Sequence, residues 1–199
     1  MLQKKQEDKR KRILEAAARA FVREGFHNAR IEDVAHEAGV AHGTVYLYFG
    51  SKDDLLISVF QENLSELIKY VNSEIQKERN AEDKLRKMIS LQIELIETNP
   101  ELTALLLVEF PRTGRFFNSH AIDGIAAYVD MIASILKQGI AENVFDDVID
   151  VDIVSTVIYA GIQGIATRWI LEEMRYPLKK VANEISDLFL RGLKSRRRV

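Results

Sequence analysis

The hydrophobic residues of this chain recur every three to four positions, which is the spacing of an α-helix with one buried face. The first such stripe lies before Gly25 and predicts a helix that begins near Asp8. Glycine readily adopts the left-handed conformation that ends many helices, so we expect this helix to stop there. The members of its buried face are Ile13, Ala16, Ala17, Ala20 and Phe21.

Two shorter helical signals follow. The first covers residues 31–38, and Gly39 then predicts a tight turn. The second covers residues 41–49, with Val45 and Phe49 on one face and small or polar side chains on the others. Such a pair is typical of a helix-turn-helix, whose second helix enters the major groove of DNA. An ordinary helical hairpin is the alternative.

The next helix begins at Ser51, whose hydroxyl can accept a hydrogen bond from the amide of Asp54 in a capping box. Apolar residues then keep helical spacing as far as Ile75, with no proline or glycine to mark a linker. We therefore expect a rigid connector. A displacement at its far end would be transmitted to the helix-turn-helix.

Five further helices are predicted beyond this connector. Pro100 separates the first two, residues 111–114 break the chain again, and Pro177 precedes the last helix. Gly161 and Gly164 would permit the close approach of another helix. The sequence thus predicts an all-α protein, with an N-terminal three-helix domain that contains the helix-turn-helix and a C-terminal helical bundle.

Three ordered runs of residues span the predicted helix pair and the start of the connector. They are Ile31-x-x-Val34-Ala35-x-x-Ala38-Gly39-Val40, Gly43-Thr44-Val45-Tyr46-x-Tyr48-Phe49 and Ser51-Lys52-x-x-Leu55. These runs resemble the DNA-binding signature of the TetR family of bacterial repressors. The resemblance covers about the first third of the chain. It implies a DNA-binding domain over residues 9–69 and a ligand-binding and dimerisation domain over residues 70–199.

Two positions depart from the family pattern. Ala29 and Arg30 stand where Thr or Ser usually precedes the first helix of the pair, so we expect Asn28 to be its N-cap. Tyr48 stands where the family most often has histidine.

The resemblance also implies a homodimer, because in the family the last two helices of each subunit form a four-helix interface. The apolar stripes of these helices could instead complete the core of one subunit. We favour the dimer.

The net charge of −2 conceals an asymmetry. Residues 1–52 carry ten Lys and Arg against seven Asp and Glu, so the DNA-facing third is the basic part. Basic residues before the first helix could neutralise phosphates, although a solvated tail is the alternative. The chain has no cysteine, and its most hydrophobic stretch, residues 153–170, contains Arg168. We expect an untargeted protein of the cytoplasm that does not enter a membrane.

No motif in the sequence supports catalysis. The four histidines form no zinc-protease arrangement, and neither a Gly-x-Ser-x-Gly elbow nor a phosphate-binding glycine loop is present. We expect no enzyme activity, no metal site and no cofactor.

A ligand pocket between helices is expected in the C-terminal bundle. Its candidate lining residues are aromatic or aliphatic, and each could equally be an ordinary core residue. They are Leu106, Phe110, Phe116, Phe117, Tyr128, Tyr159 and Trp169. Tyr46-Leu47-Tyr48-Phe49 and the leucine-rich helix after Pro100 resemble the TetR members that regulate fatty-acid degradation and sense long acyl-coenzyme A. For such a ligand, Arg112, Arg115 or Arg168 could meet the phosphates.

The interpretation is a homodimeric transcriptional repressor that binds a palindromic operator and is released by a hydrophobic ligand such as a long-chain acyl-coenzyme A. We expect His42 and Tyr48 to contact base edges and Gly43 to allow close backbone approach. Thr44, Tyr46 and Lys52 should contact phosphates, and Arg30 joins the DNA-binding candidates. A dimeric helical lipid carrier or scaffold without specific DNA binding is the competing hypothesis.

Overall fold

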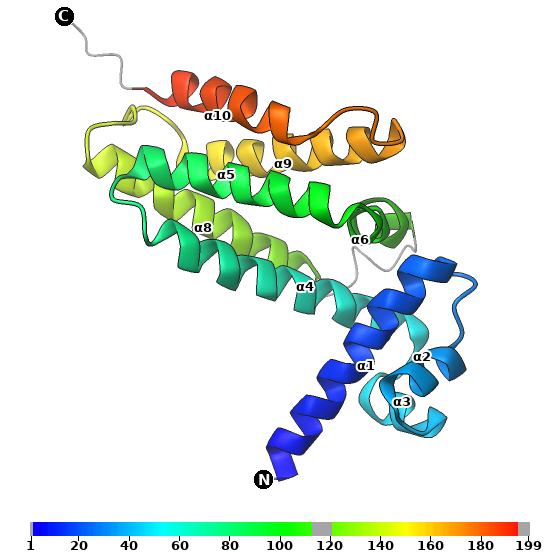
Figure 1. Cartoon of the computed structure of the whole chain (residues 1–199). Helices are drawn as coiled ribbons and strands as arrows, with labels where there is room; N and C mark the ends of the chain where they lie inside the picture. Colours follow the sequence, from blue (N-terminus) through cyan, green and yellow to red (C-terminus); the bar gives the residue numbers. More distant parts are fainter. Residues whose placement is uncertain (1, 113–120, 195–199) are drawn as a thin grey trace, which may run out of the picture. The chain divides into compact units, whose positions relative to one another are not determined.

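The computed structural model describes residues 2–112 and 121–194, with side chains for residues 5–111 and 123–194. Phe116, Phe117 and Arg115 lie outside the described residues, as does the side chain of Arg112. The described chain is helical and contains no strand (Figure 1). Its elements are α1 (Leu2–Glu24), α2 (Ile31–Ala38), α3 (His42–Tyr48), α4 (Lys52–Ile75), α5 (Ala81–Thr98), α6 (Pro100–Ala104), the π-helical turn η1 (Leu105–Glu109), α7 (Phe110–Arg112), α8 (Ala121–Ala141), α9 (Val151–Leu171) and α10 (Lys179–Leu193).

The helices group into two compact units, each built from two segments of the chain. Unit 1 contains the described residues up to Ser65 together with those from Glu101 to Gly124. Unit 2 contains residues 66–100 and the described residues from Ile125 onward. The segment with α6, η1 and α7 therefore clusters with the helix-turn-helix, although it follows the connector in sequence. Domain limits at 9–69 and 70–199 stay a prediction.

The core of unit 1 follows the predicted apolar spacing. The α1 stripe from Ile13 to Phe21 is almost fully buried, and so are the four apolar residues of α2. On the surface, the Glu37 carboxylate of α2 accepts hydrogen bonds from Arg19 at 2.5 Å and from Arg23 at 3.3 Å, both on α1. Burial and paired charges thus both fasten α2 to α1.

Two local predictions for unit 1 are wrong. Helix α1 begins at Leu2, not near Asp8, because the polar residues before Asp8 are mostly good helix formers that show no apolar stripe. Asn28 does not cap α2. Its amide nitrogen donates to the carbonyl oxygen of Glu24 at the end of α1 (3.2 Å), while Arg30 occupies the N-cap of α2 without a side-chain capping bond.

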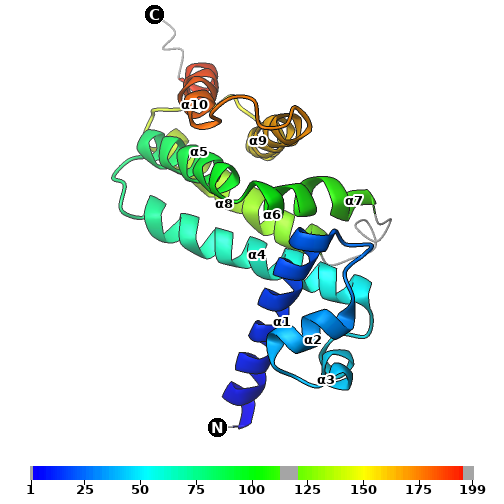
Figure 2. The same ribbon diagram turned by 45° about the vertical axis from the view of Figure 1, so that its right-hand side comes forward.

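Unit 2 is a helical bundle in which α5 contacts both α9 and α10, and Figures 1 and 2 show α10 alongside α5. Gly161 lets α9 and α10 approach closely, because a Cβ atom at this position would lie 3.1 Å from the ring of Phe189. A Cβ atom at Gly164 would meet no other part of the protein within 4 Å, and Gly164 is exposed. Only the first of the two glycines therefore serves packing within this subunit.

The segment after Pro100 differs from its prediction. We expected burial on both sides, but only Leu105 and Phe110 are buried among its described side chains. We also expected residues 111–114 to break the chain; Pro111 and Arg112 belong to α7, and residues 113 and 114 lie outside the described residues. The adjustment is a π-helical turn, in which the Phe110 amide donates to the carbonyl of Leu105, five residues back. No helix in the described chain is long and apolar enough to cross a membrane.

Candidate nucleic-acid interface

The turn between α2 and α3 has the geometry that the sequence predicts. Gly39 is left-handed, with φ of 65°, and its amide donates to the carbonyls of Ala35 and His36. The Val40 amide also donates to Ala35, at 3.0 Å. These bonds satisfy the last carbonyls of α2 and allow α3 to begin only three residues after Gly39.

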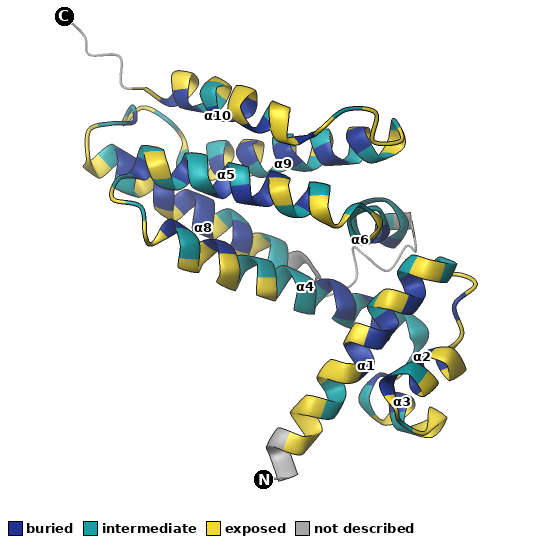
Figure 3. Ribbon diagram, viewed as in Figure 1, coloured by how far each residue is buried: buried dark blue, intermediate teal, exposed yellow. Residues whose placement is uncertain are grey.

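Helix α3 has one side packed against the protein and another side that is exposed. Val45 is 1% exposed and Phe49, at the C-cap, is also buried. His42, Gly43, Tyr46 and Leu47 are exposed, while Thr44 and Tyr48 are half-buried (Figure 3). The short residues Gly43 and Thr44 occupy the N-terminal turn, which is the part of a recognition helix that approaches base edges.

The His42 side chain is held by groups on two helices. Its Nε2 atom lies 3.3 Å from Glu32 Oε1 on α2, and its ring meets the ring of Tyr46 edge-on with centroids 5.2 Å apart. With Nε2 beside this carboxylate, Nδ1 is the other ring nitrogen through which His42 could meet a partner.

Lys52 begins α4 and is tied to the loop that follows α1. Its Nζ atom donates to the carbonyl oxygen of His27 at 3.1 Å and lies 4.8 Å from the centre of the Phe26 ring. Partial burial lowers the pKa of Lys52, while nearby Asp53 and Glu24 act in the opposite direction. An ammonium group has three N–H donors, so a phosphate can still be bound beside His27. The predicted Ser51 cap is present, with the Asp54 amide 3.0 Å from Ser51 Oγ.

The basic residues before Ile13 form part of helix α1. Arg10 lies with its guanidinium carbon 5.6 Å from the centre of the Phe49 ring and pairs with Glu62 at 3.3 Å. Lys5, Lys11 and Arg12 are exposed. Arg30 is also exposed, at the N-cap of α2, where its backbone is extended.

One exposed residue of α3 was not among the sequence-based candidates. Leu47 is 84% exposed, more than any other large hydrophobic residue that the structure describes. It follows Gly43 by four positions, so it continues the same helical face by one turn. That spacing could have identified it, but our sequence interpretation considered mainly the polar residues of the helix.

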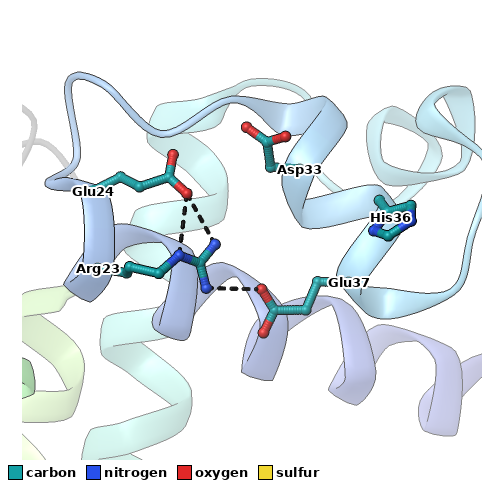
Figure 4. A pocket seen from close by; sticks show the side chains of 5 residues that line it. All are labelled: Arg23, Glu24, Asp33, His36 and Glu37. Carbon is teal, nitrogen blue, oxygen red and sulfur yellow. Dashed lines mark hydrogen bonds and ion pairs between the residues drawn. The ribbon is translucent and has the colours of Figure 1, made fainter.

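A recess in unit 1 is lined by charged side chains and one imidazole (Figure 4). Arg23 bridges two of its carboxylates, at 2.9 Å from Glu24 and 3.3 Å from Glu37. The remaining lining residues are Asp33 and His36. This lining does not suit an apolar ligand.

The predicted ligand-lining residues fall into separate groups. Leu106 and Phe110 belong to unit 1, where the Phe110 ring packs on that of Phe60 with centroids 5.0 Å apart. Tyr128, Tyr159 and Trp169 belong to unit 2. The structure thus places the five described candidates in two compact units.

A buried polar pair lies in the unit 2 core. The Tyr128 hydroxyl donates to Gln92 Oε1 at 2.6 Å, and the Tyr128 ring lies 5.8 Å from that of Tyr159. Burial raises the pKa of both tyrosines. The Trp169 Nε1 donates to the carbonyl of Tyr176 at 2.7 Å. The hydrogen bond joins α5 to α8 and the ring contact joins α8 to α9, while Trp169 is joined to the residues after α9.

Comparison with known protein families assigns both parts of the chain. Residues 13–59 match the model described as bacterial regulatory proteins, tetR family, and residues 60–192 match the model for the C-terminal region of YsiA-like proteins. The chain belongs to the TetR family. This TetR-family chain is therefore a transcriptional regulator and not an enzyme, as the sequence predicted.

Individual relatives extend over nearly the whole chain. The fatty acid metabolism regulator protein of Bacillus subtilis is 27% identical over 190 residues, which cover 96% of this chain and 98% of that protein. The structure also resembles a crystal structure of the transcriptional regulator FadR from Bacillus subtilis in complex with stearoyl-CoA, with a TM-score of 0.79 and 26% identity, covering 92% of this chain and 98% of that one. The FadR of Bacillus halodurans has the same fold, with a TM-score of 0.79 at 24% identity and coverage of 92% and 99%.

Proposed function

We propose that the chain is a homodimeric repressor that binds a palindromic operator and is released by a hydrophobic ligand such as a long-chain acyl-coenzyme A. The observation that carries this proposal is helix α3. Val45 is its only buried residue, and His42, Gly43, Tyr46 and Leu47 are exposed, so one face of the helix is open to a partner. A lipid carrier would have no need of this open helix on a packed support.

Dimerisation is supported by apolar residues that unit 2 leaves exposed. Ile153, Val157 and Leu171 are exposed on α9, and Gly164 lies on the same helical line. Leu188 on α10 is 71% exposed. An apolar surface of this kind is what a second copy of the chain would cover. Two recognition helices brought together in this way would read half-sites about 34 Å apart, or a multiple of that distance.

The ligand class is supported by the relatives and by the candidate residues. The matching FadR structure from Bacillus subtilis contains stearoyl-CoA. Candidate lining residues in unit 2 are Tyr128, Tyr159 and Trp169. Arg168 is exposed and pairs with Glu172 at 2.9 Å, so it could exchange this partner for a ligand phosphate. Release from DNA requires a coupling free energy of only about 1 to 3 kcal/mol, or roughly 5- to 150-fold in operator affinity.

Selection of bound sequences from random duplex DNA, followed by gel shifts, tests the proposal. We expect the purified protein to enrich a palindrome and stearoyl-CoA to displace it from the selected duplex. Octanoyl-CoA, with the same headgroup and a shorter chain, is the matched control for hydrophobic recognition. Failure to enrich any sequence would favour the carrier or scaffold. Enrichment without displacement would retain DNA binding and refute the ligand class.

A further inference from the structure

A hydrogen bond links the segment after Pro100 to the loop that follows α1. Glu109 Oε2 accepts it from the backbone amide of Phe26, with a distance of 3.3 Å between N and O, and both residues belong to unit 1. Gly25 has just ended α1 with a positive φ of 75°, and the Phe26 side chain is buried. A backbone amide in such surroundings needs a partner, which Glu109 supplies.

The π-helical turn explains why Glu109 is held at this position. Pro111 has no amide hydrogen, and in a regular α-helix its ring would clash with the carbonyl of Leu107. The wider turn relieves that clash. Phe110, the residue next to Glu109, is fully buried against Phe60. The burial of Phe110 therefore fixes the backbone beside Glu109 and limits how far Glu109 can move.

Glu109 and Lys52 contact the same loop, the one that follows α1. The Lys52 ammonium contacts the ring of Phe26 and the carbonyl of His27. The contacts thus form a continuous series, from the Glu109 carboxylate to the Phe26 amide and from Phe26 and His27 to Lys52 Nζ. No other carboxylate is recorded at the Phe26 amide within the described chain.

We propose that Glu109 is a positioning residue for operator binding, which acts by fixing Phe26 and His27 so that Lys52 can meet a DNA phosphate. This inference rests on the proposed DNA-binding function. Through Glu109, the segment that contains Leu106 and Phe110 is also linked by direct contacts to the proposed DNA-binding surface. A ligand that displaced η1 would withdraw the Glu109 carboxylate and leave Lys52 without its fixed support.

The test measures operator affinity against salt concentration, because each lost phosphate contact lowers the slope of log K against log salt by about 0.9. We expect Lys52→Ala and Glu109→Ala each to lower the slope by about this amount and the affinity about fivefold at 0.15 M salt. The double variant should lose no more than either single one, since both remove the same contact.

Three companion variants separate positioning from charge and folding. Glu109→Gln retains an acceptor oxygen and should keep the wild-type slope. Glu101→Ala removes the same charge from an exposed site on α6 and should also keep it. Glu109→Asp retains the charge but withdraws the acceptor, so it should behave like Glu109→Ala and replaces it if that variant does not fold. Hydrogen exchange at the Phe26 amide should accelerate in the Ala and Asp variants alone.

A wild-type slope in folded Glu109→Ala or Glu109→Asp would overturn the positioning role, and so would additive losses in the double variant. Either result would leave the proposed function standing, because the wild-type protein would still bind its operator. Absence of any salt-dependent binding by the wild-type protein would instead overturn the proposed function itself.

Discussion

At the scale of single residues, an exposed leucine in a recognition helix calls for a hydrophobic partner. The major groove offers one, since thymine alone among the four bases presents a methyl group there. Leu47 projects from the same face as Gly43, one turn along α3. Exposure of the Leu47 side chain destabilises the free protein only slightly, whereas its contact with a thymine methyl group would add selectivity for A·T pairs.

The first prediction follows from this chemistry. Leu47→Ala should weaken binding to the selected operator by about three- to tenfold. Replacing one thymine by deoxyuridine, which lacks the methyl group, should produce the same loss for the wild-type protein. The variant should then be indifferent to that replacement, as gel-shift titrations of the four combinations would reveal. Equal sensitivity of both proteins to deoxyuridine would contradict the assignment.

A second prediction at the scale of single residues concerns Glu37, because the pKa of its carboxyl affects how the stability of the fold depends on pH. Hydrogen bonds from Arg19, followed by those from Arg23, lower the pKa of this carboxyl despite some opposing burial. A folded-state pKa below the unfolded value stabilises the fold at higher pH, and this contribution is lost as pH falls through the folded pKa.

Urea unfolding of wild-type protein and Glu37→Gln at several pH values measures this contribution. We expect wild type to be more stable from about pH 6 to 8, with the difference shrinking below about pH 4.3, the ordinary pKa of glutamate. The difference at neutral pH should be about 1 kcal/mol or less, since the pair is partly exposed. A difference that stayed constant down to pH 3 would show that charge pairing is not its source.

At the scale of elements, the sequence predicted helices well wherever one apolar stripe defines them. Gly25 and Gly39 end their helices as expected, and Ser51 caps α4. The wrong predictions arise where contacts between distant residues decide the structure, or where one residue could form either of two local hydrogen bonds. Asn28 could have capped α2, but it bonds back to Glu24. The π-helical turn could not be read from Pro111 alone, because a break in the helix would relieve the same clash.

The same limit applies to the candidate site. The pattern from Gly43 to Phe49 predicted a short helix with an exposed face, and α3 has one, because such a helix is local in sequence. Which groups hold each side chain is not local. Glu32 lies ten residues before His42, and Glu109 lies 83 residues after Phe26. No spacing rule connects such pairs.

A third prediction concerns the turn of the helix-turn-helix. Gly39→Ala should destabilise the fold by about 1 to 2 kcal/mol, because φ is positive there and an added Cβ would strain the backbone. No atom lies within 4 Å of that Cβ position, so steric contact is not the cause.

Gly192→Ala is the matched control, since its Cβ position is equally open but lies within helix α10 with no positive φ. We expect this change to stabilise the fold by about 0.5 to 1 kcal/mol. Denaturant midpoints of the two variants should therefore move in opposite directions. Similar shifts in both would refute the backbone explanation.

At the scale of the whole molecule, α9 and α10 expose apolar residues that a second copy of the chain covers in the proposed dimer. The buried residues of these helices, such as Ile162 and Ile185, already complete the core of unit 2. Val157 and Leu188 lie outside that core, with 52% and 71% of their surfaces exposed. The two helices thus have apolar surface beyond the needs of a single subunit.

The fourth prediction is that the wild-type protein is a dimer, and that Val157→Glu combined with Leu188→Glu gives a folded monomer that binds the operator at least tenfold more weakly. Val148→Glu is the control, because this valine is also highly exposed but lies in the loop before α9. Sedimentation equilibrium measures the mass and circular dichroism the helical content. A dimeric double variant would refute the proposed interface.

The exposed stripe on α9 also determines how such a regulator would respond to its own abundance. Reversible association through this stripe would leave a pool of free subunits in equilibrium with the dimers. Below the dissociation constant of the pair, the concentration of dimers rises with the square of the subunit concentration. Doubling the expression of the gene would then raise operator occupancy almost fourfold at low occupancy, and modest changes in protein synthesis would have steep effects on the genes it controls.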